Sequence, residues 1–133
     1  MKMIAAVVLL TVVTGCQSFA TGKSPIASFV ETDDAGKVLR QLSFALTSKP
    51  ADTCISGDWK VAKRLKGSHP DLHAPAYSWE GGRLEILLVT NICDGYVSYV
   101  GNVSAGVFKG EHVAYGLGHS KKLGNVSGTL SGP

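Results

Sequence analysis

Two histidines and an aspartate in one short segment are the residues whose types and spacing come closest to a metal site. His69, Asp71 and His73 alternate in the sequence His-Pro-Asp-Leu-His. In an extended chain such alternate side chains point to one side, where they would offer two imidazoles and a carboxylate. The neighbouring prolines disfavour the helix on which an H-E-x-x-H zinc site is built. We therefore interpret residues 66–75 as a polar loop and assign no metal ligand and no cofactor.

Groups that could act in hydrolysis are present, but no motif connects them. The chain contains many serines together with His112 and His119, yet it has no G-x-S-x-G nucleophile elbow. Asp58 and Glu85 could serve as an acid–base pair, although no spacing relates one to the other. We expect a protein that is not an enzyme and assign no catalytic residue.

An apolar segment at the N-terminus ends in a cysteine. After Lys2, residues 3–13 are apolar except for one threonine. This length is typical of the apolar region of an export signal and is shorter than the roughly 20 residues that span a bilayer. The sequence Val-Thr-Gly-Cys at residues 13–16 resembles the lipobox of bacterial lipoproteins. The resemblance implies that residues 1–15 are a signal peptide and that acyl chains such as palmitate are attached to Cys16.

The same resemblance indicates where the protein is held. Each buried methylene contributes about 0.8 kcal/mol, so two or more acyl chains would attach Cys16 durably to a membrane. The next residue is Gln17, not the aspartate that marks inner-membrane retention in enterobacteria. We expect an outer-membrane lipoprotein that faces the periplasm, with the inner membrane and the cell surface left open.

Size, charge and cysteine content are those of a small exported domain. Removing residues 1–15 from the chain of 133 leaves 118 residues, enough for one domain with a hydrophobic core. Of the 13 Lys and Arg residues, Lys2 is lost, which leaves 12 against 10 acidic residues and gives no reason to expect nucleic-acid binding. With Cys16 acylated, Cys54 and Cys93 remain, and an oxidising compartment favours a disulfide between them.

The mature chain divides into a lipidated tether over residues 16–32 and a single domain over residues 33–133. The tether is small, polar and interrupted by Pro and Gly. Within the domain, apolar residues at helical spacing predict a helix over residues 34–48. These residues are Val38, Leu39, Leu42, Ala45 and Leu46.

Downstream of Cys54, short candidate strands alternate with turn signals. The predicted strands cover residues 57–64, 83–90, 96–100, 104–109 and 112–117. An N-terminal helix followed by such strands predicts an α+β fold with a small antiparallel sheet. Whether that sheet closes into a barrel is not decided by the pattern.

Two features of the predicted first strand allow a functional interpretation. Gly-Asp-Trp at residues 57–59 resembles the G-x-W that opens the first strand of lipocalin and avidin-like barrels, which implies an apolar cup for a small ligand. The arginine that covers the tryptophan in those families is missing from the closing strand, where Lys121 and Lys122 stand nearby. Four cations also lie in and just after this strand, and they either contact lipid phosphates and acidic polymers or protect a sheet edge from aggregation. They are Lys60, Lys63, Arg64 and Lys66.

Together these patterns favour a non-catalytic protein of the cell envelope. We expect membrane attachment through Cys16 and an accessory or protein-binding role with an envelope protein as partner, because tethering raises the effective concentration of the domain towards membrane partners. The alternative is a barrel that binds a small ligand or lipid; a metal-dependent or hydrolytic enzyme ranks behind both.

Overall fold

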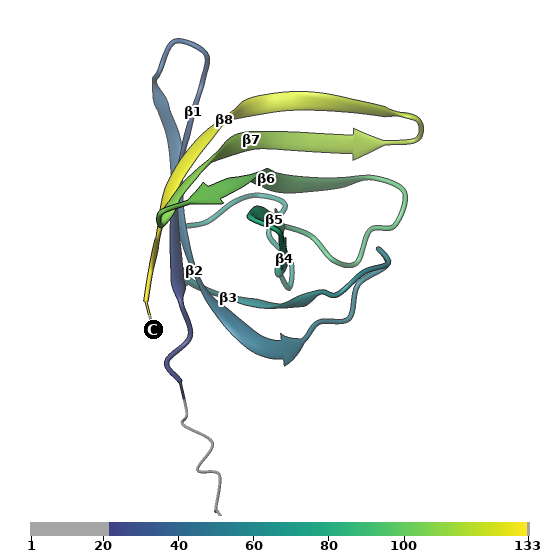
Figure 1. Ribbon diagram of the computed structural model, residues 1–133. Helices are drawn as coiled ribbons and strands as arrows, with labels where there is room; N and C mark the ends of the chain where they lie inside the picture. Colours follow the sequence, from purple (N-terminus) through teal and green to yellow (C-terminus); the bar gives the residue numbers. More distant parts are fainter. Residues whose placement is uncertain (1–21, 133) are drawn as a thin grey trace, which may run out of the picture.

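Eight antiparallel strands form a closed barrel in the computed structural model, which describes residues 22–132. Each strand pairs with the next one along the chain, and β8 pairs with β1 to close the sheet (Figure 1). Among the described residues, no helix is long and apolar enough to cross a membrane. The strands are β1 (Ile26–Thr32), β2 (Val38–Pro50), β3 (Lys60–Lys66), β4 (Ala76–Glu80), β5 (Arg83–Leu87), β6 (Tyr96–Ser104), β7 (Val107–Gly116) and β8 (His119–Ser131).

The predicted helix over residues 34–48 is wrong, and with it the α+β class, because β2 occupies this segment. Leu42 and Leu46 are four residues apart and fit either a helix or a strand. Phe44 lies between them and is fully buried, so every second side chain points into the barrel, as in a strand. Val38 and Leu39, which the helical pattern placed in its apolar stripe, are 51% and 42% exposed.

The first strand lies within the segment that we expected to be tether. Residues 26–32 form β1, which pairs with β2 on one side and with β8 on the other. Its inward-facing residues are Ala27, Phe29 and Glu31. A charged residue at an inward position hides the apolar alternation by which a strand is recognised. Cys16 and the predicted signal peptide lie outside the described residues.

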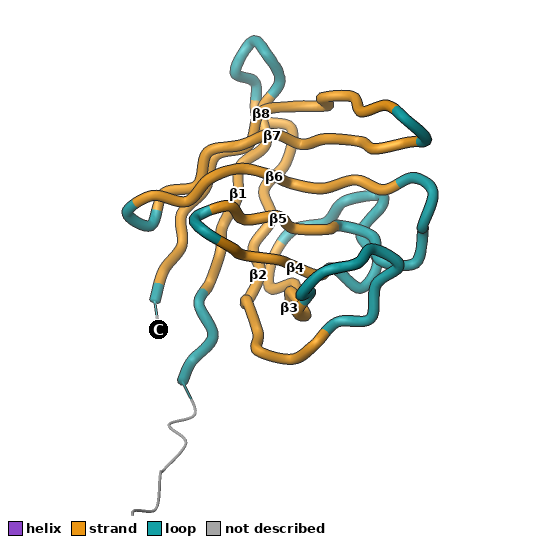
Figure 2. The backbone as a smooth tube through the Cα atoms, turned by 45° about the vertical axis from the view of Figure 1, so that its right-hand side comes forward, coloured by secondary structure: helices purple, strands orange, loops and turns teal. Residues whose placement is uncertain are grey.

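The downstream strands are confirmed in outline. Predicted strands at residues 83–90 and 96–100 correspond to β5 and β6, whereas those at 104–109 and 112–117 overlap one continuous strand, β7. The long connections gather at one end of the barrel, seen as teal segments on the right of Figure 2. The predicted disulfide lies among them and joins Cys54 to Cys93, with 5.1 Å between the Cα atoms.

Aromatic side chains fill the middle of the barrel. Phe29 contacts Phe44, Tyr99 and Phe108, with ring centroids 6.2, 5.6 and 5.1 Å away, respectively. Leucine and isoleucine side chains from β2 and β5 complete this cluster. Gly128 on β8 makes room for it, because a Cβ there would lie 2.8 Å from the ring of Phe29. An eight-stranded barrel is just wide enough for its interior to be filled by side chains, and here they fill it.

Candidate functional site

A buried carboxylate connects side chains from four strands inside the barrel. Glu31 accepts a hydrogen bond from Tyr99 at 2.8 Å on Oε2, and the same oxygen lies 3.2 Å from Nε of Arg40. Its other oxygen, Oε1, lies 2.8 Å from Nδ1 of His112. Because an ionised carboxylate only accepts hydrogen bonds, we assign the proton of this contact to the histidine Nδ1. Glu31 thus has three donors around it, as a buried charge requires.

Strand register places these four residues together. Glu31 on β1 stands opposite Arg40 on β2, and Tyr99 on β6 stands opposite His112 on β7. The pairing of β7 with β8 shifts by one residue just after His112, and such a bulge can re-aim a side chain. Gly124 on β8 leaves space for the carboxylate, since a Cβ at that position would lie 3.0 Å from Oε1 of Glu31.

A fifth polar residue, His69, reaches this network from the loop between β3 and β4. Its ring lies perpendicular to that of His112, with the centroids 5.1 Å apart. The loop is fixed beyond His69 by two backbone hydrogen bonds, from His73 to Leu88 and from Thr90 to His73. Leu72, which lies between His69 and His73 in the sequence, packs against the barrel core. The loop therefore holds an imidazole inside the barrel, and His69 is only 7% exposed.

Both histidines have a buried ring nitrogen without a hydrogen-bond partner among the described residues. These atoms are Nε2 of His69 and Nε2 of His112. The opposite nitrogens are engaged: Nδ1 of His69 accepts a hydrogen bond from the backbone N–H of Asp71 at 3.0 Å, and Nδ1 of His112 donates to Glu31. Buried polar atoms are usually paired, so two neighbouring exceptions single out this part of the core.

Burial controls the protonation of two members of the network. Burial, helped by the positive charge of Arg40, lowers the pKa of His69 from its ordinary value of 6.5 to about 4, so the ring is neutral at pH 7. Burial also raises the pKa of Tyr99, with the hydrogen bond to Glu31 acting in the same direction. Tyr99 therefore remains a hydrogen-bond donor at every physiological pH.

Acid should destabilise the protein through His69. The unfolded chain takes up a proton on this histidine near pH 6.5 and the folded chain only near pH 4, so the free energy of unfolding falls as the pH decreases through this window. The difference between the two pKa values corresponds to a decrease of up to about 3 kcal/mol in the free energy of unfolding. Arg40 and His112 lower the pKa of His69, whereas Asp71 and Glu31 oppose them.

Urea denaturation at pH 7.0, 5.5 and 4.5 in the presence of a chelator measures this loss. The variant His69→Gln should lose less stability on acidification than the wild type. His73→Gln, which changes an exposed histidine of the same loop, should behave as the wild type. Equal acid sensitivity of the two variants would show that His69 does not carry the effect.

The three alternating residues considered as a metal set are not brought together. His69 points into the barrel, whereas Asp71 and His73 are exposed. Of the two histidines considered for hydrolysis, His112 is buried at the Glu31 network and His119 is exposed at the start of β8. Sequence reasoning missed Glu31, Arg40 and Tyr99. A glutamate that follows apolar residues at the alternate positions 27 and 29 was the one available signal for a buried charge.

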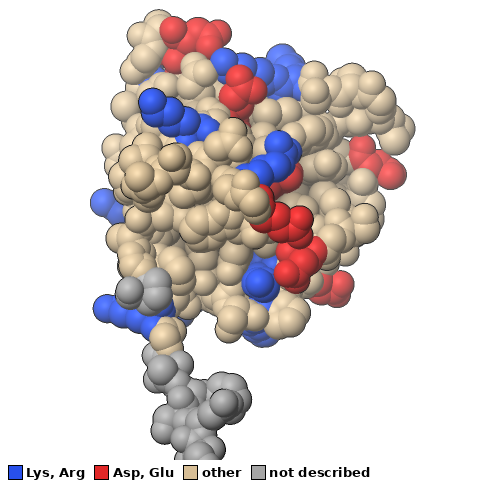
Figure 3. Space-filling view, viewed as in Figure 1, with Lys and Arg blue, Asp and Glu red and all other residues tan. Residues whose placement is uncertain are grey.

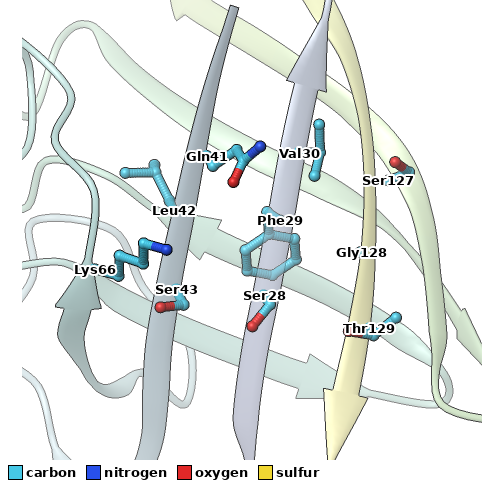
Figure 4. Close-up of a pocket in the computed structure, with 10 residues that line it drawn as sticks. All are labelled: Ser28, Phe29, Val30, Gln41, Leu42, Ser43, Lys66, Ser127, Gly128 and Thr129. Carbon is cyan, nitrogen blue, oxygen red and sulfur yellow. The ribbon is translucent and has the colours of Figure 1, made fainter. Parts of the chain in front are cut away.

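The outer face of the barrel carries a hollow of about 450 Å³ over β2, β1 and β8 (Figure 4). It forms where the outward side chains are small, and its lining includes Ser28, Ser43, Ser127 and Thr129. The inward-facing residues Phe29, Leu42 and Gly128 contribute to its floor. Lys66, at the end of β3, adds a positive charge at its margin.

Comparison of the chain with protein-family models, with curated proteins and with solved structures found no match. The fold and the geometry of the chain itself therefore carry the functional interpretation.

Proposed function

We propose that this protein is a lipid-anchored binding module of the bacterial cell envelope. Acyl chains on Cys16 attach it to the outer membrane, a short tether follows, and the barrel recognises an envelope protein through its outer surface. The observation that carries the proposal is the filled interior: the aromatic cluster around Phe29 and the Glu31 network occupy the space where a hollow barrel holds its ligand. Recognition then uses the outside of the barrel.

The exposed cations of β3 support a position close to a membrane. Lys63, Arg64 and Lys66 are exposed, and their strand pairs with β2, which pairs with the first residues of β1. Two strand spacings amount to about 10 Å, so these cations lie near the point where a tether would join the barrel. In Figure 3, Lys and Arg side chains lie near the start of the described chain. Each cation near an anionic lipid surface contributes about 1 kcal/mol to membrane binding.

A small-ligand barrel is the second candidate, and the closed antiparallel barrel itself favours it. Trp59 is buried beside Ala76 and Leu87 in a small apolar cluster next to β3. A ligand in the barrel centre would have to displace Phe29 and its neighbours. A small ligand would therefore bind in the outer hollow, or inside the barrel only after the core has rearranged.

Attachment of lipid to Cys16 is the first prediction of the proposal. Cells expressing the full chain are grown with labelled palmitate, and the protein should carry the label and sediment with the membranes. Cys16→Ser should remove essentially all of the label, because the acylated thiol is gone. Cys54→Ala/Cys93→Ala, which removes only the disulfide, should keep the label. Equal labelling of the wild type and Cys16→Ser, or no labelling of either, would refute the anchor.

A further inference from the structure

We propose that Glu31, His69 and His112 form a binding site for a divalent transition-metal ion of the zinc class. This site shares only His69 with the alternating set His69, Asp71 and His73 that the sequence analysis considered. It is independent of membrane attachment and of any protein partner.

The three side chains come from separate parts of the chain and meet inside the barrel. Glu31 lies on β1, His112 on β7 and His69 in the β3–β4 loop, and one ligand atom of each lies within 4.8 Å of the others. Ligand atoms around one tetrahedral zinc ion are roughly 3.4 Å apart, given metal–ligand distances near 2.1 Å. Oε1 of Glu31 and Nδ1 of His112 are already 2.8 Å apart, so these two atoms can hold one ion once Nδ1 has lost its proton. Closure then requires a movement of about 1 Å, chiefly of His69 on its loop.

The unpaired ring nitrogen of His69 is the independent sign of a ligand. Nε2 of His69 is buried and has no partner among residues 22–132. Leaving such an atom unpaired in a barrel interior is unfavourable, and a metal ion bound through it would satisfy it. His112 would bind the same ion through Nδ1, the ring nitrogen that faces Glu31. Both rings belong to residues that are at most 7% exposed, so bulk water does not replace the missing partner.

A carboxylate stands behind the ring of His69, as is usual for metal-binding histidines. Nδ1 of His69 lies 3.7 Å from the Asp71 carboxylate. In the metal-free protein the proton of His69 is on Nε2, because Nδ1 accepts the backbone N–H of Asp71. Metal binding shifts this proton to Nδ1, where the Asp71 carboxylate accepts it. Asp71 would therefore orient the ring of His69 without touching the metal.

The donor set selects the kind of ion. Two imidazoles and one carboxylate suit zinc, cobalt, nickel and copper, whereas calcium and magnesium prefer oxygen ligands only. Arg40 and Tyr99 contact Oε2 of Glu31, whereas the one donor to Oε1 is Nδ1 of His112. Release of that proton to solvent leaves Oε1 and Nδ1 with lone pairs for the metal. The guanidinium thus lies on the oxygen away from the proposed ion.

Zinc titration of the full chain tests the site. The protein is purified in detergent, stripped with a chelator and titrated with zinc by calorimetry, and metal retained after gel filtration is counted by mass spectrometry. We expect one zinc ion per chain for the wild type. His69→Ala should weaken binding at least about 100-fold, because one of three ligands is lost. His73→Ala and His119→Ala, which change exposed histidines, should bind as the wild type does.

Two further measurements keep the proposal falsifiable if a core variant folds poorly. Asp71→Asn changes an exposed side chain and should weaken zinc binding about 10- to 100-fold through the orientation of His69. Cobalt should give the visible absorption bands of a tetrahedral site in the wild type and lose them in His69→Ala. Absence of stoichiometric zinc binding, or its loss in His73→Ala or His119→Ala with retention in His69→Ala, would overturn the proposal. Either result leaves the lipid anchor and the protein-binding role untouched.

Discussion

Replacing Glu31 with leucine should lower the free energy of unfolding by about 3–5 kcal/mol, the range measured when one partner of a buried ion pair is removed. Removal of the Glu31 carboxylate leaves Arg40 without its ion-pair partner. It also leaves the Tyr99 hydroxyl and Nδ1 of His112 buried without a hydrogen-bond acceptor. Leucine has a similar volume, so a cavity contributes little. Urea denaturation at pH 7 measures the change.

Glu111→Leu is the matched control, because Glu111 is an exposed glutamate on β7 that contacts Lys122. A surface change of this kind should alter the free energy of unfolding by at most about 0.5 kcal/mol. Adding Arg40→Met to Glu31→Leu should recover part of the lost stability, since an apolar pair avoids the uncompensated charge. If Glu31→Leu were as stable as Glu111→Leu, the Glu31 network would not be the stabilising centre of the barrel interior.

Removing the disulfide should cost about 4 kcal/mol in the chain-entropy account, because Cys54 and Cys93 are 39 residues apart in the sequence. The double variant Cys54→Ala/Cys93→Ala should unfold at a lower urea concentration than the oxidised wild type. The bond ties together two connections at the end of the barrel where long loops gather, so its loss frees both.

A reducing agent provides the control for this prediction. It should lower the urea midpoint of the wild type to that of the double variant, and it should leave the midpoint of the double variant unchanged. Identical midpoints for the oxidised and reduced wild type would mean that the bridge does not form in the purified protein or does not constrain the unfolded chain.

The sequence predicted the disulfide and much of the downstream sheet, because cysteine number and period-2 runs such as that of β5 are local signals. It failed at β2, where Leu42 and Leu46 satisfy helical and strand periods equally. Barrel closure depends on the pairing of β1 with β8, whose residues are about 100 positions apart, and no local pattern encodes that pairing.

The candidate site was harder to predict than the fold. His69 and His112 were visible as chemistry-bearing residues, but each was grouped with its sequence neighbours. Glu31 is separated from His112 by 81 residues and from Tyr99 by 68 residues. Such a cluster exists only once strand register is fixed, so single-sequence reasoning identifies its members without showing that they meet.

The central claim is that a membrane-held barrel recognises a protein through its outer surface, and photo-cross-linking in living cells tests it most directly. A photoreactive residue is placed at outward positions of different strands, Ser28, Glu80 and Lys109, one at a time, in the full chain and in Cys16→Ser. The account predicts a dominant adduct with one envelope protein from one side of the barrel, strongly reduced in Cys16→Ser. Absence of a protein adduct at every position, together with a small molecule that copurifies with the wild-type chain, would contradict it and favour the ligand-binding barrel.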